Sequence, residues 1–116
     1  MRFMVIVKAN KDSEAGMMPD TKILAAMGKY NEELVKNGVM LAGEGLHPSS
    51  KGKRVKFSGS QRTITDGPFA ETKDVIGGYT LVEARDLDQA VELSKGCPIF
   101  EGGGAVEVRP VMKLNV

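Results

Sequence analysis

The chain has 116 residues, a length that suits one domain with a single two-layer core. Hydrophobic residues make up 41% of it and charged residues 27%, which is a globular rather than a disordered composition. Lys and Arg number 16 against 15 Asp and Glu, so no strong field draws the chain to nucleic acid or to anionic lipid. We therefore expect one domain over residues 1–116, with no nucleic-acid partner and no membrane partner.

Targeting signals and cysteine content agree with this assignment. No apolar run approaches the roughly 20 residues that a membrane helix needs. The apolar start of the chain is too short for a secretory signal. Cys97 is the single cysteine, so no disulfide can form within the chain and no oxidising compartment is indicated. The expected location is the cytoplasm.

The N-terminal third predicts a strand followed by a helix. Residues 2–9 are β-rich and apolar on both alternating sets of side chains, which is typical of a strand covered on both faces. After a polar loop over 11–19, Asp20 is suited to cap a helix that ends at Asn37, with Gly38 as the left-handed residue behind it. An apolar stripe at three- and four-residue spacing marks the inner face of this helix: Ile23, Met27, Tyr30 and Leu34, flanked by Leu24 and Val35.

The middle of the chain predicts strands. Residues 39–46 favour a second strand, loosened by its glycines. A hairpin follows, in which 54–57 and 62–65 pair around a Ser-Gly-Ser turn over 58–60. Its side chains alternate between apolar and polar, which indicates a half-exposed pair of strands. Residues 75–83 predict the next strand.

A second helix and a last strand complete the pattern. Asp86 is suited to cap the helix, and Gln89 three positions later completes a capping box. Gly96 and Pro98 end the helix, and the last strand is expected over 105–111. The inner face of the helix is expected to hold Leu87, Ala90, Val91 and Leu93.

The order of these elements predicts the fold class. With the hairpin set aside, the order is the βαββαβ pattern of a ferredoxin-like α+β sandwich, whose two helices cover one face of an antiparallel sheet. The first strand is nevertheless apolar on both faces. Leaving the second face wet would cost several kcal/mol, at roughly 25 cal/mol per Å² of apolar area. We therefore expect a homodimer packed sheet to sheet, a dimeric α/β barrel with an inserted β-hairpin.

The string DGPFAETK over 66–73 and the Gly-Gly-Tyr over 77–79 resemble the YCII-related family, in particular its DGPF-type members. The resemblance implies a dimeric ferredoxin-like α+β barrel, related in shape to muconolactone isomerase-like and cofactor-independent monooxygenase-like proteins. It implies no particular activity, and no cofactor is expected. Further matching pieces cover nearly the whole chain: 27–31, 43–48, 88–90 and 107–111.

The chain departs from the family pattern at one functional position. The shorter YCII proteins carry a histidine near the start of the first helix, proposed to form a catalytic dyad with an aspartate. This chain has Asp-Thr-Lys-Ile over 20–23 and no histidine there. His47 follows the second strand and is not the same position, so that dyad does not transfer to this sequence.

His47 and Asp66 are the candidate catalytic residues. His47 is the only histidine, and the only side chain expected to titrate near neutral pH without help. As a general base it would need an orienting carboxylate, which Asp66 or Glu44 could supply. The alternative for His47 is a loop histidine that satisfies a hydrogen bond. The alternative for Asp66 is a turn carboxylate that accepts backbone N–H bonds.

Four further charged residues are candidates for ligand binding. Glu71 and Lys73 fall on one face of an extended stretch and could fix a polar ligand or pair across the dimer; a solvated surface is the alternative. Glu107 and Arg109 share one face of the last strand. Arg109 could hold a carboxylate substrate bidentately, or pair structurally with Glu107 or Asp66.

Two functional hypotheses of different classes follow. With one cysteine and one histidine no structural zinc site can be assembled, so we expect no metal, and Cys97 favours a packed thiol. The first hypothesis is a homodimeric small-molecule-binding protein with a cleft between sheet and hairpin. It would carry out cofactor-free isomerase- or lyase-like proton transfer, with His47 as base, Asp66 as its orienter or as a second acid, and Arg109 as anion clamp. The second is a non-catalytic dimeric interaction or regulatory module. The sequence leaves open whether the protein is an enzyme.

Overall fold

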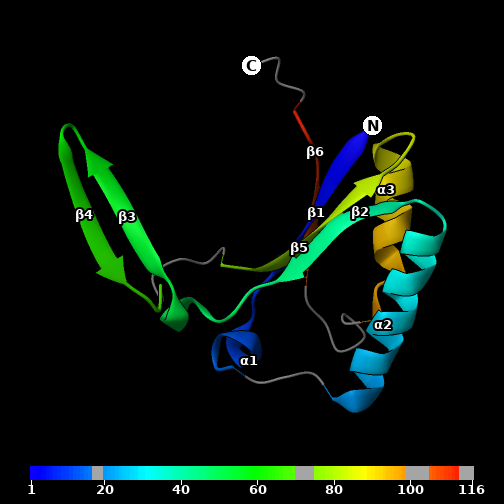
Figure 1. Cartoon of the computed structure of the whole chain (residues 1–116), viewed down its shortest axis with the longest axis horizontal. Helices are drawn as coiled ribbons and strands as arrows, with labels where there is room; N and C mark the ends of the chain where they lie inside the picture. The colour runs from blue at the N-terminus through cyan, green and yellow to red at the C-terminus, as the bar shows by residue number, and fades with distance from the viewer. Residues whose placement is uncertain (17–19, 70–74, 99–104, 113–116) are drawn as a thin grey trace.

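The computed structural model describes residues 1–16, 20–69, 75–98 and 105–112. Strands and helices are interspersed along these ranges, beginning with a strand (Figure 1). In chain order the elements are β1 (Arg2–Lys8), α1 (Lys11–Glu14), α2 (Thr21–Lys36), β2 (Met40–Gly45), the 3₁₀ turn η1 (Ser49–Lys51), β3 (Lys53–Ser58), β4 (Gln61–Asp66), β5 (Ile76–Glu83), α3 (Leu87–Lys95) and β6 (Val106–Pro110).

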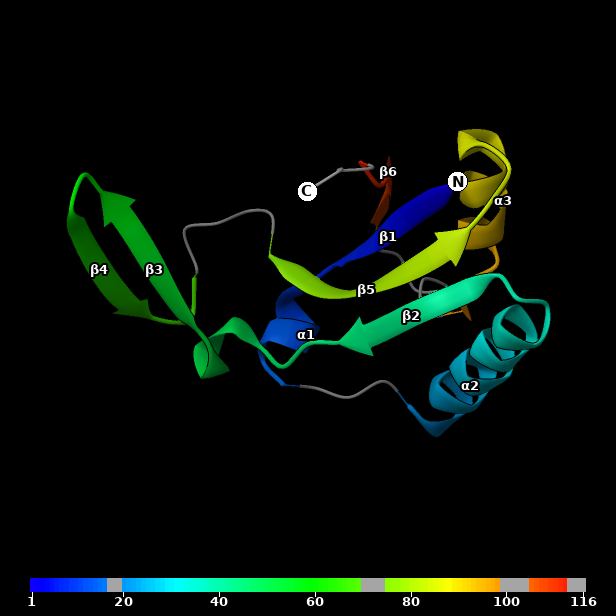
Figure 2. The same cartoon turned by 45° about the horizontal axis from the view of Figure 1, so that its top comes forward.

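Four strands form one antiparallel sheet in the order β2-β5-β1-β6. Strands β1 and β5 lie in the centre of the sheet, and β2 and β6 lie at its edges. Helices α2 and α3 pack on one side of the sheet (Figures 1 and 2). This is the layering of a ferredoxin-like α+β fold, as the order of the elements predicts.

The core lies between the sheet and α3. Phe3 of β1 and Val82 of β5 are cross-strand partners, and both are almost fully buried. Ala90 of α3 is completely buried against them. Because paired residues of adjacent strands share a face, the helix-facing set of β1 is the one that contains Phe3 and Val5.

Helix α2 begins and ends where the sequence predicts. The Asp20 carboxylate accepts the backbone N–H of Ile23 at 2.8 Å, and Gly38 has a φ of +70°. Of the predicted stripe only Leu34 is fully buried, whereas the flanking Leu24 and Val35 are exposed. The apolar face of α2 is therefore narrower than its sequence pattern indicates. No helix in the described ranges is long and apolar enough to cross a membrane.

Helix α3 differs from expectation in its cap and its inner face. Asp86 accepts the N–H of Gln89 at 2.9 Å, and this bond holds the pKa of Asp86 below its usual range. The side-chain oxygen of Gln89 accepts the backbone N–H of Arg85, one residue before the cap, and not that of Asp86 as a capping box requires. Leu87 and Val91, predicted on the inner face, are exposed. The residues buried on α3 are the small Ala90 and Ser94, whose size lets the helix approach the sheet closely.

The predicted polar loop after β1 contains a short helix, α1. Asn10 accepts the N–H of Ser13 at 2.8 Å, and the Ser13 hydroxyl accepts the N–H of Asn10 at 2.9 Å. This reciprocal capping box nucleates a single helical turn in a segment with no apolar periodicity. The prediction of a loop was wrong for residues 11–14. Helices were predicted from apolar periodicity, whereas this helix is indicated only by its capping residues.

Strands β3 and β4 form a separate two-stranded antiparallel sheet, which we call the arm (residues 53–66). Lys53 lies opposite Asp66 at its base, and Gly59 adopts a φ of +58° at its turn. The arm projects away from the four-stranded sheet in both views (Figures 1 and 2). Every side chain of β4 is exposed.

Candidate functional site

Cross-strand pairing divides the side chains of the four-stranded sheet into two faces. The helix face contains Val5, Thr80 and Val108 in one row. The opposite face, which we call the open face, has no helix over it (Figure 1). Its two rows run across all four strands: Ala42, Leu81, Met4 and Arg109, then Glu44, Tyr79, Ile6 and Glu107.

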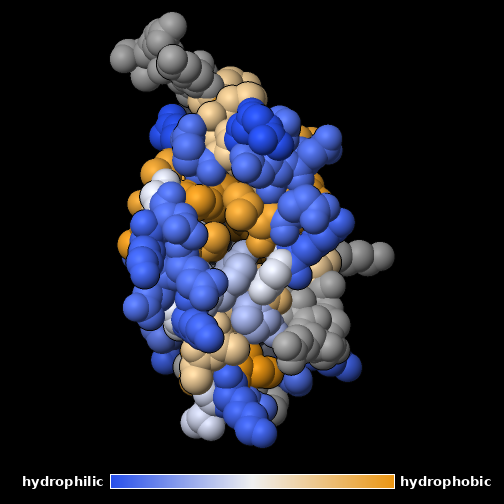
Figure 3. Space-filling view, turned by 90° about the vertical axis from the view of Figure 1, so that its right-hand side faces the viewer, coloured by the Kyte–Doolittle hydropathy of each residue, from blue (hydrophilic) through white to orange (hydrophobic). Residues whose placement is uncertain are grey.

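A cavity of about 290 Å³ lies on the helix face, between α2, the sheet and the end of α3; we call it the helix-side cavity. On the side of the molecule that carries the two helices, hydrophobic surface gathers between two ridges of polar side chains (Figure 3). Glycines make room for the cavity, because the positions of β2 and β5 that face α2 include residues without side chains. These positions are Gly43, Gly45 and Gly78.

Two polar groups of the helix-side cavity are already committed to protein partners. The Tyr30 hydroxyl donates to the backbone carbonyl of Leu93, which ties α2 to α3. Burial raises the pKa of the Tyr30 hydroxyl above its usual range, and the neighbouring Cys97 acts in the same direction. The Cys97 thiol lies 3.6 Å from the sulfur of Met27. Tyr30 is therefore a neutral donor at physiological pH, and Cys97 is packed as its sequence context favours.

Two other polar groups of this cavity are available to a ligand. In the described part of the chain, neither the side-chain amide of Asn31 nor the hydroxyl of Thr80 has a hydrogen-bond partner. Asn31 can both donate and accept, and Thr80 can do the same. Among the described residues the lining contains no Lys, Arg or His, and its one acidic residue, Glu44, has its side chain on the open face. The cavity thus combines an apolar wall with uncharged hydrogen-bonding groups.

A second, more open cavity of about 460 Å³ lies at the base of the arm, and it contains His47. We call it the arm-base cavity. Its walls come from the loop after β2, from η1 and from the start of β5. The guanidinium carbon of Arg54 lies 4.4 Å from the centre of the Phe69 ring, so a cation–π contact forms part of its wall. This is the cavity nearest to the predicted cleft between sheet and hairpin.

The DGPF turn is anchored by Ser49 of η1. The Ser49 hydroxyl accepts the N–H of Phe69 at 3.1 Å and donates to the carboxylate of Glu14. Glu14 also accepts the N–H of Ser49 at 3.0 Å. Gly67 packs so closely here that a Cβ would lie 1.7 Å from the carbonyl oxygen of Ser49. Only glycine fits at this position, so the conspicuous DGPF string is explained in part by this junction between α1, η1 and the turn.

The predicted catalytic pair is not joined in the described residues. His47 is exposed in the arm-base cavity, whereas Asp66 is bound to the side chain of Lys53 across the arm. The carboxylate of Asp66 is largely exposed and does not line that cavity. Asp66 thus has a partner that sequence reasoning did not consider, because Lys53 becomes its neighbour only through the register of β3 on β4.

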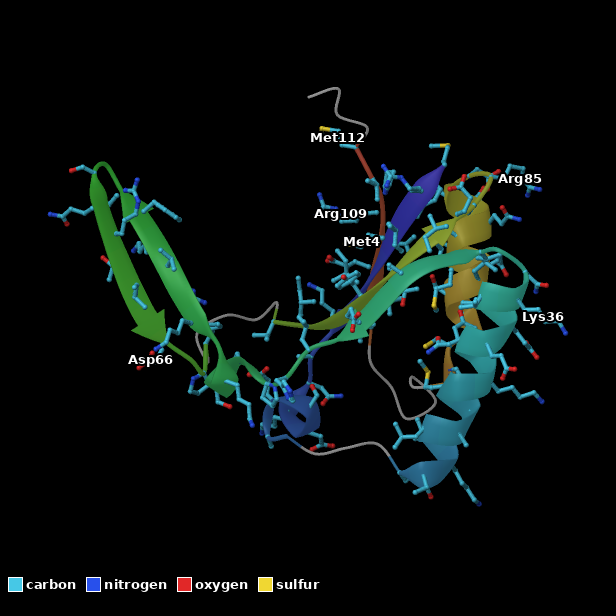
Figure 4. The ribbon with its side chains drawn as sticks, in the orientation of Figure 1. Met4, Lys36, Asp66, Arg85, Arg109 and Met112 are labelled. Carbon is cyan, nitrogen blue, oxygen red and sulfur yellow. The ribbon has the colours of Figure 1, made fainter. Side chains whose placement is uncertain are left out.

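The predicted ligand-binding residues lie elsewhere. Arg109 and Glu107 are on the open face, so neither shares a cavity with His47. Met4 and Arg109 point to the same side of the sheet, away from α2 and α3 (Figure 4). Glu107 lies 3.5 Å from the Lys8 ammonium, which replaces Arg109 as its expected partner. Glu71 and Lys73 lie outside the described residues.

Sequence reasoning missed the residues of the helix-side cavity, Tyr30, Asn31 and Thr80. One signal was present. Tyr30 and Asn31 place polar groups on the apolar stripe of α2 while the facing strand is glycine-rich. A large polar aromatic residue opposite a wall without side chains indicates space that the core does not fill.

The sequence matches the YCII-related domain family over residues 1–115, and the chain belongs to that family. A curated relative, an uncharacterized protein of Rhizobium meliloti (strain 1021), is 26% identical over 93 residues, which is 79% of this chain and 75% of the relative. A solved structure with the same fold is 5-chloro-2-hydroxyhydroquinone dehydrochlorinase (TftG) from Burkholderia phenoliruptrix, in complex with 2,5-dihydroxybenzoquinone. It superposes with a TM-score of 0.54 at 18% identity, covering 97% of this chain and 94% of that one.

Replacing Ser49 tests the anchoring of the DGPF turn. Ser49→Ala removes the hydroxyl that serves Glu14 and Phe69, and leaves a half-buried carboxylate and an N–H without that partner. We expect the free energy of unfolding in urea to fall by about 1–3 kcal/mol. The control is Ser50→Ala, which removes an exposed hydroxyl from the next residue. Equal unfolding midpoints for the two variants would contradict the anchoring role.

Proposed function

We propose that this member of the YCII-related family binds a small, mostly apolar molecule of about one ring in the helix-side cavity. The observation that supports it is the cavity itself, about 290 Å³ of space between α2 and a glycine-lined wall. Ligand sites start at roughly 300 Å³, and a dry cavity of about 150 Å³ admits benzene. A single substituted ring therefore fits, and a nucleotide or a fused cofactor does not.

The lining selects the chemistry of the ligand. Because its described lining includes no Lys, Arg or His, the cavity offers no cation to hold an anion. Asn31 and Thr80 offer uncharged donors and acceptors to a hydroxyl or carbonyl group on the ligand. A neutral phenol or quinone has this combination. The dehydrochlorinase of the same fold, solved with 2,5-dihydroxybenzoquinone, supports this ligand class.

Filling the helix-side cavity tests the binding proposal. Gly43 faces α2, and a Cβ there would make only ordinary contacts, so Gly43→Val adds bulk to the cavity without a backbone clash. We expect neutral phenols and quinones, titrated by calorimetry, to bind the wild type and to bind Gly43→Val at least tenfold more weakly. Bound ligand also raises the melting temperature of the wild type.

The control for this experiment is Ala42→Val, which adds bulk to the same strand on the open face. We expect Ala42→Val to bind the ring compounds as the wild type does. Equal affinity for the wild type and Gly43→Val would place the binding site elsewhere. No binding by the wild type across the panel would remove the proposal.

Acid–base chemistry belongs to a second, separate site, the arm-base cavity, where His47 is the candidate base. His47 is exposed in the arm-base cavity, where a substrate can reach it. A ligand there would also meet the aromatic ring of Phe69 and the guanidinium of Arg54. Asp66 can orient His47 only after leaving Lys53, so its part in the reaction is a separate question.

Proton transfer without a cofactor can be measured as hydrogen–deuterium exchange. We expect the wild type to accelerate exchange at the carbon next to the carbonyl of cyclic ketones and lactones in D₂O, followed by NMR. His47→Gln should lower the rate by a factor of 10² or more, since a positioned base contributes about 10²–10⁴. A matching loss in Asp66→Asn would show that Asp66 orients the base. Equal exchange rates in wild type and His47→Gln would exclude His47 as the base.

The alternative function is assembly, a homodimer of α/β-barrel type whose interface is the open face. The central positions of that face are the apolar side chains of Met4, Ile6 and Leu81. Its edges carry charged side chains, Glu44 on β2 and both Glu107 and Arg109 on β6. A two-fold axis that lays β2 of one copy over β6 of the other would cover the apolar centre and bring Glu44 near Arg109 of the partner. This arrangement gives Arg109 a partner in place of a substrate carboxylate.

The solution mass tests this interface. The chain has a mass of 12.5 kDa, and we expect sedimentation to give twice that value for the wild type. Ala42→Lys should give a monomer, because it places a charge in the row of Leu81 and Met4 in both copies. The control is Ala25→Lys, an exposed position on α2. A dimer that tolerates Ala42→Lys would exclude the open face as its interface.

A further inference from the structure

The arm has an apolar face that the described residues of its own chain leave exposed. The register places Val55 opposite Ile64 and Phe57 opposite Arg62, so these four side chains share one face. Phe57 and Ile64 are 67% and 65% exposed, and Val55 is 48% exposed. A two-stranded hairpin is only marginally stable alone in water and needs a hydrophobic partner. Large exposed side chains gathered in this way mark a docking surface.

The direction of the arm is set by its base. The N–H of Gly67 donates to the carbonyl of Gly52 at 3.0 Å, which closes the hairpin at its root. Lys53 and Asp66 pair beside this bond, and Ser49 holds the turn that follows. These contacts join the base of the arm to η1 and α1. The arm stands clear of the sheet in two views (Figures 1 and 2).

Charge identifies the occupant of this face as a second copy of the chain. The arm carries four basic residues and one acidic residue, whereas the other residues of the chain contain twelve basic and fourteen acidic ones. The arm is therefore positive by three charges and the body negative by two. The guanidinium carbon of Arg62 lies 4.7 Å from the centre of the Phe57 ring, so this positive charge borders the apolar face directly. A basic, apolar arm complements a mildly acidic body of the same protein.

We propose that the arm is a clasp whose Val55, Phe57 and Ile64 face packs against the body of a second copy. The clasp rests on the dimer proposed above and extends it, because each subunit then grips its partner outside the sheet-to-sheet contact. Figure 4 shows Arg109 directed to the side of the sheet toward which the arm projects. A partner seated on the open face is thus within the concave side formed by the sheet and the arm.

A double variant on each face of the arm separates the clasp from the rest of the dimer. Val55→Thr with Ile64→Thr removes apolar contact but keeps β-branched residues, so the hairpin retains its strand preference. Thr63→Ser with Thr65→Ser changes the opposite face of β4 and is the matched control. Far-ultraviolet circular dichroism verifies that both variants fold. Dissociation constants of the dimer come from sedimentation equilibrium over a dilution series.

We expect the dimer of the Val55→Thr, Ile64→Thr variant to dissociate at a concentration at least tenfold above that of the wild type, and the control to stay within twofold. The wild-type dimer should also weaken as NaCl rises from 50 to 500 mM, since screening removes the attraction between arm and body. Equal dissociation constants for both double variants would overturn the clasp and leave the sheet interface standing. A monomeric wild type, whatever else the arm binds, would overturn clasp and dimer together and leave the ligand cavity untouched.

Discussion

The central strand β1 is apolar on both faces, and the rest of the molecule is arranged around the need to cover both. On one face Phe3 and Val5 pack under the helices, with α3 close to the sheet through Ala90. On the other face Met4 and Ile6 have no helix above them. Burial of apolar area is the main driving force of folding, and the proposed homodimer would supply the cover that this second face lacks.

The cover on the helix face is incomplete, and the gap is where ligand binding is proposed. Helix α2 is tied to α3 by the bond from Tyr30 to Leu93, but the strands beneath it contribute Gly43, Gly45 and Gly78. Glycine cannot fill space, so a helix at ordinary packing distance leaves a void above it. The proposed ligand binding and the proposed assembly use opposite sides of the same strands, so a ligand would enter one face while a partner occupied the other.

The junction at Ser49 connects the N-terminal helix to the arm. Its hydroxyl joins Glu14 of α1 to the backbone of the DGPF turn, and Gly67 is packed against its carbonyl. The same junction forms the floor of the arm-base cavity that contains His47. The DGPF string is therefore explained by backbone geometry and by the direction it gives the arm. The acidic side chain of that string, Asp66, is bound to Lys53 and closes the hairpin.

The sequence alone determined the elements whose signals are local. Neighbouring residues determine the caps at Asp20 and Asp86, the left-handed Gly38 and the turn at Gly59. The apolar side chains on both faces of β1 indicated a face that no helix covers. The tertiary structure decided what depends on residues distant along the chain. It paired Asp66 with Lys53 through strand register, placed Arg109 on the open face and His47 in the arm-base cavity, and opened a cavity where α2 meets glycines. The spacing of residues along the chain indicates secondary structure, whereas a cavity or an ion pair forms only where distant segments come together in the folded protein.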